Sequence, residues 1–398
     1  MAMKQTQTKL FDFSDVGLDF CAGSKNLFPD RFKKMLALGY NEQTVSSVAV
    51  AGNQVTLTYG GAHGYVADRV LKVDAGALAL VNDGEFWIDS VTTNTVTFTL
   101  DPAPPSVESG FNTRIAPLGW ELVYEQANIH VYKLKALDES NIFLRLCFQN
   151  NTAYRNRVSP CVGRSFNPST GEITDEAALA ETKNITSPAT FAWEFSLAAN
   201  ATYDNHSYAN GYNIFGRAVV VGSKYHLALL CSTWSGSTAR VNAVIPYQSL
   251  DYSVIKLPLL LGETATPTGN GQNNQLTNLK LYAGKFETKI QASNSTTFAP
   301  SYAAAQSFLP LAIDGFNTTT AGPLMIYEKI SGQFLGITNG FYYTYYGVSS
   351  SDVPSSDNKV VPLQTADVDI SSICFVHCVA AGQQNVFFTI PVEEIKIA

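Results

Sequence analysis

Charge is scarce in this chain, and the shortage limits what the protein can bind. Only 15% of the 398 residues are charged, and the formal net charge is −7 with no run of basic residues. Affinity for nucleic acid depends on clustered Lys and Arg, so we expect no nucleic-acid partner. Apolar residues make up 45% of the chain, which is typical of a folded protein. Ser, Thr, Asn and Gln replace the missing charge, which favours a surface packed against other proteins.

Long hydrophobic runs are also missing. No window approaches the roughly 18 uninterrupted apolar residues of a membrane-spanning helix. The first residues, MAMKQTQTK, lack the apolar stretch of a signal peptide. We therefore expect no membrane partner and a protein made soluble in the cytoplasm. Six cysteines are widely scattered, which favours reduced, buried thiols over a disulfide framework.

Side chains that carry chemistry are few, beginning with five histidines. His377 lies between Cys374 and Cys378, but strand alternation would place the two thiols on one face and the imidazole on the other. His63 lies among glycines, yet no Gly-x-Ser-x-Gly elbow and no phosphate-binding glycine motif occurs. We therefore predict no catalytic residue, no cofactor and no metal site.

Two alternatives involve isolated carboxylates. Asp204, Asp251 and Asp314 could supply a carboxylate pair for glycoside cleavage, which depends only on their separation in space. Asp352 and Asp357 could hold calcium through loop oxygens, although the EF-hand spacing is absent. An enzyme, mainly a depolymerase, remains the third functional hypothesis.

Two consecutive β-hairpins are the clearest pattern in the chain. Residues 45–50 and 54–59 alternate apolar and polar side chains around a turn at residues 51–53. Residues 85–92 and 95–100 repeat the pattern around a turn at residues 93–94. Such alternation with Gly or Asn at the reversal predicts half-buried antiparallel strands. Further strands are predicted at residues 120–124, 129–134, 142–148, 158–166, 217–221, 225–232, 241–247, 324–329, 341–346, 370–379 and 386–390.

Helices are predicted in two or three places. Residues 26–39 combine an Asn cap, a proline in the first turn and a closing glycine, with Phe28 and Phe32 on one face. This helix should pack on the first β module or on a partner subunit. Shorter helices are predicted at 174–183 and 301–309, and polar loops at 262–278 and 349–357.

The predicted fold class is mainly β, with several antiparallel sandwich or barrel modules. The boundaries that we expect are an arm and helix at residues 1–43, a small immunoglobulin-like β module at 44–117, a larger β domain at 118–315 and a C-terminal β region at 316–398. Residues 1–9 should form a polar arm that orders only in an assembly, with the fold beginning at Leu10, Phe11 and Phe13. Removing the arm should leave the folded domains intact.

Tyrosines concentrate at residues 341–346, FYYTYY. On a strand, Tyr343 and Tyr345 would share one face, and Tyr342 and Tyr346 the other. Tyrosine is common at interfaces because it is large, stiff and amphipathic. These four tyrosines, with Phe28 and Phe32, are the interface candidates. Sugar binding by stacked rings and ordinary core packing are the alternatives.

The order of several landmarks resembles a family of structural proteins encoded in the morphogenesis region of tailed bacteriophages. The resemblance covers residues 28–165 and is carried by the helix up to Tyr40 and by the segments VAVAGNQVTL (48–57), AHGY (62–65), VLKV (70–73), GEFWI (84–88), TVTFT (95–99), APLGWE (116–121), VYK (131–133) and FLRL (143–146). In that family a helix ending in Gly precedes an immunoglobulin-like β module, and a Pro-x-Gly-Trp connector leads into a second β region.

The resemblance implies a virion component that assembles in the host cytoplasm, with partners that are copies of itself and other virion proteins. Head decoration, neck or collar, and tail periphery all fit. No catalytic residues belong to the pattern. The alternative is an appendage module that binds a host receptor or surface glycan through Tyr343 and Tyr345.

Overall fold

The protein is mainly β, as predicted. The structure, a computed structural model, describes residues 8–19, 27–151, 157–179, 191–195, 218–233, 238–250, 256–264, 279–290, 321–344, 364–366, 372–381 and 384–392. Within these ranges every named strand pairing is antiparallel and one α-helix is present. The antiparallel sheets include a half-barrel. None of the described helices is long and apolar enough to cross a membrane.

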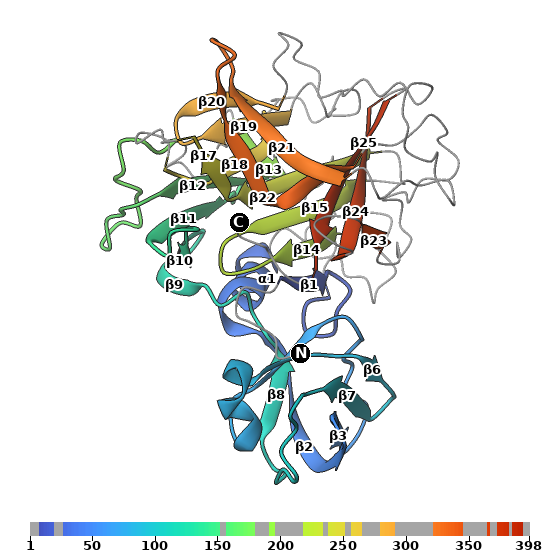
Figure 1. Cartoon of the computed structure of the whole chain (residues 1–398). Helices are drawn as coiled ribbons and strands as arrows, with labels where there is room; N and C mark the ends of the chain where they lie inside the picture. The colour runs from blue at the N-terminus through green and yellow to red at the C-terminus, as the bar shows by residue number, and fades with distance from the viewer. Residues whose placement is uncertain are drawn as a thin grey trace, which may run out of the picture.

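The chain forms two β regions that lie one above the other in Figure 1, with α1 (Phe28–Lys33) and β1 (Lys9–Asp12) between them. The lower region is a seven-stranded sheet in the order β5-β4-β8-β2-β3-β7-β6. Its strands are β2 (Tyr40–Ala51), β3 (Gln54–Tyr59), β4 (Val70–Val73), β5 (Glu85–Trp87), β6 (Ser90–Val91), β7 (Thr95–Thr99) and β8 (Asn112–Ile115).

The first predicted hairpin is confirmed, and the second is confirmed only in part. Strands β2 and β3 pair from Val45↔Tyr59 to Ala51↔Gln54 around a two-residue turn. The segment 85–92, expected to be one strand, is two. The N–H of Ile88 donates to the Arg69 carbonyl, whereas the N–H of Asp89 donates to the Thr97 carbonyl. Consequently β5 pairs with β4 and only β6 pairs with β7.

The upper region joins eighteen strands into one branched sheet. These are β1, β9 (Glu121–Gln126), β10 (Ile129–Lys135), β11 (Asn141–Phe148), β12 (Arg157–Gly163), β13 (Phe191–Glu194), β14 (Ala218–Gly222), β15 (Leu227–Thr233), β16 (Thr238–Ile245), β17 (Tyr247–Ser249), β18 (Leu259–Thr264), β19 (Leu279–Ala283), β20 (Phe286–Lys289), β21 (Ala321–Glu328), β22 (Phe334–Thr344), β23 (Gln364–Ala366), β24 (Ser372–Ala381) and β25 (Gln384–Pro391). All the strands predicted for this part of the sequence are present, with shifted ends.

The sheet branches where two strands pair with different parts of the same edge of a third strand. Strand β22 pairs with β21 along one edge, while its other edge pairs first with β17 and then with β25. Gly336 lies where β17 meets β22, at a φ of +153°, and a Cβ there would lie 1.9 Å from the Gln248 carbonyl oxygen. Only glycine permits this approach of the two backbones.

The predicted helix is present as α1 followed by a π-helical turn, Lys34–Leu38, and it ends at Gly39 with a φ of +78°. The predicted Asn cap is wrong, because the N-cap residue is Leu27, which makes no side-chain cap hydrogen bond. The helix predicted at 174–183 is wrong for its described part, residues 174–179, which form a turn. The Asp175 carboxylate accepts hydrogen bonds from the N–H groups of Arg164 and Ala177, which holds this turn. The helix predicted at 301–309 lies outside the described residues.

Two further expectations need correction at the ends of predicted segments. Residues 262–264, expected in a polar loop, extend strand β18, and the rest of that loop and all of 349–357 lie outside the described residues. Thr8 and Lys9, expected in a polar arm, are buried. Thr8 Oγ1 donates to the Pro391 carbonyl at 2.7 Å, and Lys9 Nζ reaches Glu85 Oε1 at 2.8 Å. Polar groups can join a core when distant partners satisfy them.

One hydrophobic core is continuous between the two β regions. It includes Phe98 of the lower sheet, Phe32 of α1, and Trp120 and Phe191 of the upper region. A second core lies wholly among β1 and the strands from β14 onward. The continuous core fixes the upper and lower regions in contact with each other.

Candidate functional site

The aromatic residues of α1, predicted as interface candidates, lie inside the chain's own core. Phe28 and Phe32 are 1% and 0% exposed. Both rings make edge contacts with Phe195, at 4.9 and 5.9 Å, and Phe32 also contacts Phe148 at 5.5 Å. The helix therefore packs on the upper β region of the same chain, and these two side chains offer no surface to a partner subunit.

Of the four candidate tyrosines, only Tyr342 has a described side chain, which is half-buried. It lies in β22, opposite Pro323 of β21. Tyr343 is also in β22, opposite Phe388, but only its backbone is described. Tyr345 and Tyr346 lie outside the described residues.

Tyr342 is part of a larger apolar surface on the hairpin of β21 and β22, which protrudes at the top of Figure 1. The inward side chains Leu324, Ile326 and Leu335 are buried. The outward side chains are apolar as well, and together we name them the β21–β22 outer face: Pro323, Met325, Tyr327, Phe334, Ile337 and Tyr342.

The β21–β22 outer face is partly open to solvent: Pro323 and Met325 are exposed, and its other four side chains are half-buried. Met325 is 49% exposed, and Ile330, at the tip of the hairpin, is 92% exposed. The Tyr327 and Phe334 rings contact each other at 5.4 Å. Sequence reasoning missed this surface, although a signal exists: residues 323–327, PLMIY, are apolar at every position, whereas a strand covered on one face only should alternate.

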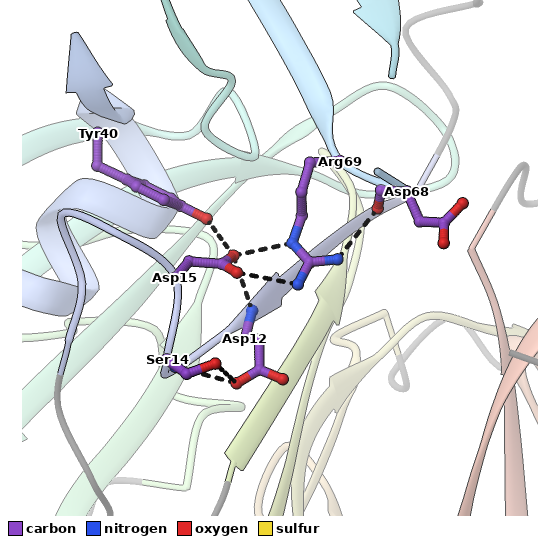
Figure 2. Close-up of polar contacts among 6 residues, drawn as sticks. All are labelled: Asp12, Ser14, Asp15, Tyr40, Asp68 and Arg69. Carbon is purple, nitrogen blue, oxygen red and sulfur yellow. Dashed lines mark hydrogen bonds and ion pairs between the residues drawn. The ribbon is translucent and has the colours of Figure 1, made fainter. Parts of the chain in front are cut away.

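A buried polar network lies where the two β regions meet (Figure 2). Asp15 follows β1 of the upper sheet, and Arg69 immediately precedes β4 of the lower sheet. Arg69 Nε donates to Asp15 Oδ2 at 2.8 Å, and Arg69 Nη2 donates to Asp15 Oδ1 at 3.0 Å. The hydroxyl of Tyr40 and the N–H of Asp12 also donate to Asp15 Oδ2, at 2.8 and 3.1 Å.

This network is built for structure rather than for chemistry. Burial alone would lower the pKa of Arg69, but the Asp15 carboxylate outweighs that effect and raises it. Burial, followed by the Asp15 charge, raises the pKa of Tyr40 well above its ordinary value, so its hydroxyl stays protonated and donates. The Asp15 carboxylate already accepts four hydrogen bonds. A saturated bidentate pair of this kind locks two elements together.

Lys9 adds a second buried polar contact between the regions. Lys9 Nζ, on β1, donates to Glu85 of the lower sheet and to the Pro117 carbonyl at 2.5 Å. Burial lowers the pKa of Lys9. Within the upper region, Trp120 Nε1 donates to the Ser223 carbonyl at 2.9 Å. The two β regions are thus held together by specific hydrogen bonds in addition to the continuous core.

The histidines that have described side chains are engaged inside the protein. His63 is 2% exposed; its Nδ1 accepts from the N–H of Tyr65 at 2.9 Å, so the proton is assigned to Nε2, 3.1 Å from the Thr95 carbonyl. Burial lowers the pKa of His130 to about 4 and that of His226 to about 3. Glycine geometry and burial explain His63 without catalysis.

Within the described part of the chain, no group of three or more His, Cys, Asp or Glu side chains could hold a metal ion. Cys147, Cys161 and Cys231 are buried and reduced, as predicted. The backbone of β24 carries Cys374, His377 and Cys378 in regular pairing with β25, but their side chains are outside the described part. The same holds for the carboxylates considered for glycoside cleavage or calcium binding: Asp204, Asp251, Asp314, Asp352 and Asp357.

The site geometry thus consists of an exposed apolar hairpin face on a rigidly joined pair of β regions. The chain has no match among protein families, curated proteins or solved structures.

Proposed function

We propose that this chain is a non-enzymatic structural component of a tailed-phage virion, in the head decoration, the neck or collar, or the tail periphery. It acts by burying β surfaces against further copies of itself and against neighbouring virion proteins. The observation that carries the proposal is the apolar, partly solvent-exposed β21–β22 outer face. The phage-like landmarks and the charge-poor composition support it.

The β21–β22 outer face has the composition of an interface centre. Met and Tyr are enriched at such centres, and charged residues gather at the rim. A rim is present here, because Glu287 of β20 pairs with Lys280 at 3.1 Å and with Lys329 at 2.6 Å. A specific contact would bury at least about 1,000 Å² in total, so the hairpin would form the middle of a larger footprint.

Rigid joining of the two β regions favours the same role. A subunit that fixes the position of its neighbours must not bend between its own parts. The Asp15–Arg69 pair, the hydrogen bonds of Lys9 and the continuous core meet that requirement.

The proposal can be tested with the double variant Met325→Ser/Ile330→Ser. Both side chains are exposed, so the free energy of unfolding should change by less than about 0.5 kcal/mol. Incorporation into particles should fall roughly tenfold, because apolar anchors carry most of the binding energy of an interface. The matched control is Leu80→Ser, which removes an equally exposed side chain from the lower region. Equal incorporation of the double variant and the wild-type chain would contradict the proposal.

The second candidate is an appendage module that binds a host surface glycan. The tyrosines first considered for it, Tyr343 and Tyr345, have no described side chains. A specific observation elsewhere favours saccharide binding, namely a cleft beside β17.

A further inference from the structure

A cleft of about 340 Å³ opens between the turn after β10, the segment after β12, strand β17 and the residues that lead into β18. Its volume is at the small end of the ~300–1,000 Å³ range of ligand sites, which suits one or two sugar rings. The hydrogen bonds described above that join the two β regions lie elsewhere.

Positive charge prevails among the described residues that line this cleft. Lys135, Arg164 and Lys256 supply three cations, and Asp138 supplies the one carboxylate. The chain as a whole carries a formal charge of −7, so a cationic cleft is a local departure from its composition. An anionic group would be drawn into it.

Arg164 has only one long ion pair with a carboxylate among the described residues. The carboxylate oxygen paired with it, Asp138 Oδ2, is 3.9 Å away, beyond hydrogen-bonding distance. Its Nη2 donates to the Lys256 carbonyl at 3.3 Å, and its Nε is buried with no acceptor among the described residues. The guanidinium N–H groups of a structural arginine normally donate to a carboxylate or to carbonyl oxygens, as those of Arg69 donate to Asp15. Among the described residues the fork of Arg164 is only partly filled, so it can receive the carboxylate of a ligand.

The remaining walls fit a sugar ring better than a phosphate. Tyr247 and Leu257 provide apolar surface, and Gln248 provides an amide for hydroxyl groups. Asp138 can accept hydrogen bonds from sugar hydroxyls, and it would repel a phosphate dianion more strongly than the single charge of a carboxylate. In the described part of the chain, no helix N-terminus or glycine cradle, the usual phosphate binders, lines the cleft.

We propose that this cleft binds an anionic saccharide unit, a pyranose that carries a carboxylate. Arg164 and Lys256 would hold the carboxylate, Gln248 and Asp138 the hydroxyl groups, and Tyr247 one face of the ring. This inference does not rest on the virion role, since binding is a property of the purified chain.

The test is titration of the full-length chain with methyl β-glucuronide, methyl β-glucoside and inorganic phosphate, followed by calorimetry or NMR. The glucuronide should bind at least roughly tenfold more tightly than the neutral glucoside, and phosphate should not displace it. Arg164→Gln and, separately, Lys256→Gln should each weaken glucuronide binding by roughly tenfold. Lys256 is exposed, so its variant keeps the test valid if Arg164→Gln folds poorly.

The matched control is Lys133→Gln, which removes the same charge from strand β10 two residues before Lys135 and outside the cleft. It should bind the glucuronide as the wild-type chain does. Equal binding of glucoside and glucuronide, displacement by phosphate, or unchanged binding by both cleft variants would each overturn the inference. None of these results bears on particle incorporation, so failure here is distinct from failure of the proposed function.

Discussion

The ion pair between Asp15 and Arg69 shows how single residues join the two β regions. Both side chains are at most 9% exposed, and they come from segments of different sheets. Taking two charges out of water is costly, and the cost is offset only when the geometry is good and the remaining lone pairs are satisfied. Tyr40 and the Asp12 N–H supply those extra bonds here.

Replacing Arg69 by Met should therefore lower the free energy of unfolding by about 3–5 kcal/mol, because Asp15 is left buried and unpaired. The double variant Asp15→Leu/Arg69→Met should lose less than the sum of the single variants. Urea unfolding of the four proteins measures this. Lys133→Gln, which breaks an exposed pair with Glu121, should change stability by no more than about 1 kcal/mol. An Arg69→Met variant as stable as the wild-type chain would contradict this role of the pair.

Buried histidines give the fold a pH dependence of defined sign. The pKa of His226 is about 3 and that of His130 about 4 in the folded chain, because burial disfavours the charged ring. Both values lie below the unfolded value of about 6.5, so the unfolded chain binds more protons as the pH falls. Stability is thus fully present above pH 6.5 and declines below it, by about 2 kcal/mol per histidine between pH 7 and pH 5.

Denaturant unfolding at pH 7 and pH 5 measures this decline, in a window where carboxylates remain ionised. The variant His226→Phe removes one of these two buried histidines and should show about half of the decline that they cause together. The comparison uses only the change in the free energy of unfolding between pH 7 and pH 5, so a different stability of the variant at pH 7 does not affect it. A decline equal to that of the wild-type chain would show that His226 is not the source.

At the scale of elements, local patterns predict hairpins well and distant pairings badly. The β2–β3 hairpin follows from alternation and a Gly-Asn turn, both visible within fifteen residues of sequence. The division of residues 85–92 does not, because the partner of β5 is β4, which no local pattern identifies. The burial of Lys9 was missed for the same reason. Its hydrogen-bond partners, Glu85 and the Pro117 carbonyl, are distant in the sequence and meet it only in the folded chain.

The candidate site was less predictable than the fold. The tyrosines of β22 stand out in the sequence but Met325 on the facing strand does not, because pairing decides which apolar residues share an exposed face. Arg164 could not be identified from the sequence, because its 3.9 Å distance from Asp138 and its place in the cleft are set by the fold.

Removal of strand β1 should lower stability strongly, although the strand has only four residues. It pairs with β14 and buries Leu10 and Phe11. Deleting residues 1–12 should lower stability by roughly 4 kcal/mol or more, at about 1.5–3 kcal/mol for each buried apolar side chain, and it also removes the hydrogen bonds of Lys9. Thermal melting measures the effect. Deletion of residues 1–7 alone, which removes no described residue, is the control and should leave the melting temperature unchanged. Equal melting of both truncations would show that β1 is dispensable.

The whole molecule is a rigid double β unit that presents an apolar hairpin face. Its charge-poor surface suits assembly, and its buried histidines, thiols and ion pairs are used to hold the fold. The proposed role is therefore structural, and it requires that the chain be part of the virion particle.

Quantitative mass spectrometry of purified particles shows whether the chain has that location. The proposed role assigns the chain to a tailed phage, so the particles should come from cells infected by that phage, with the clarified lysate measured beside them. We expect peptides of this chain in the particles, in several copies relative to the major head protein and retained through density-gradient purification. Abundance of the chain in the lysate, together with its absence from the purified particles, would contradict the virion role.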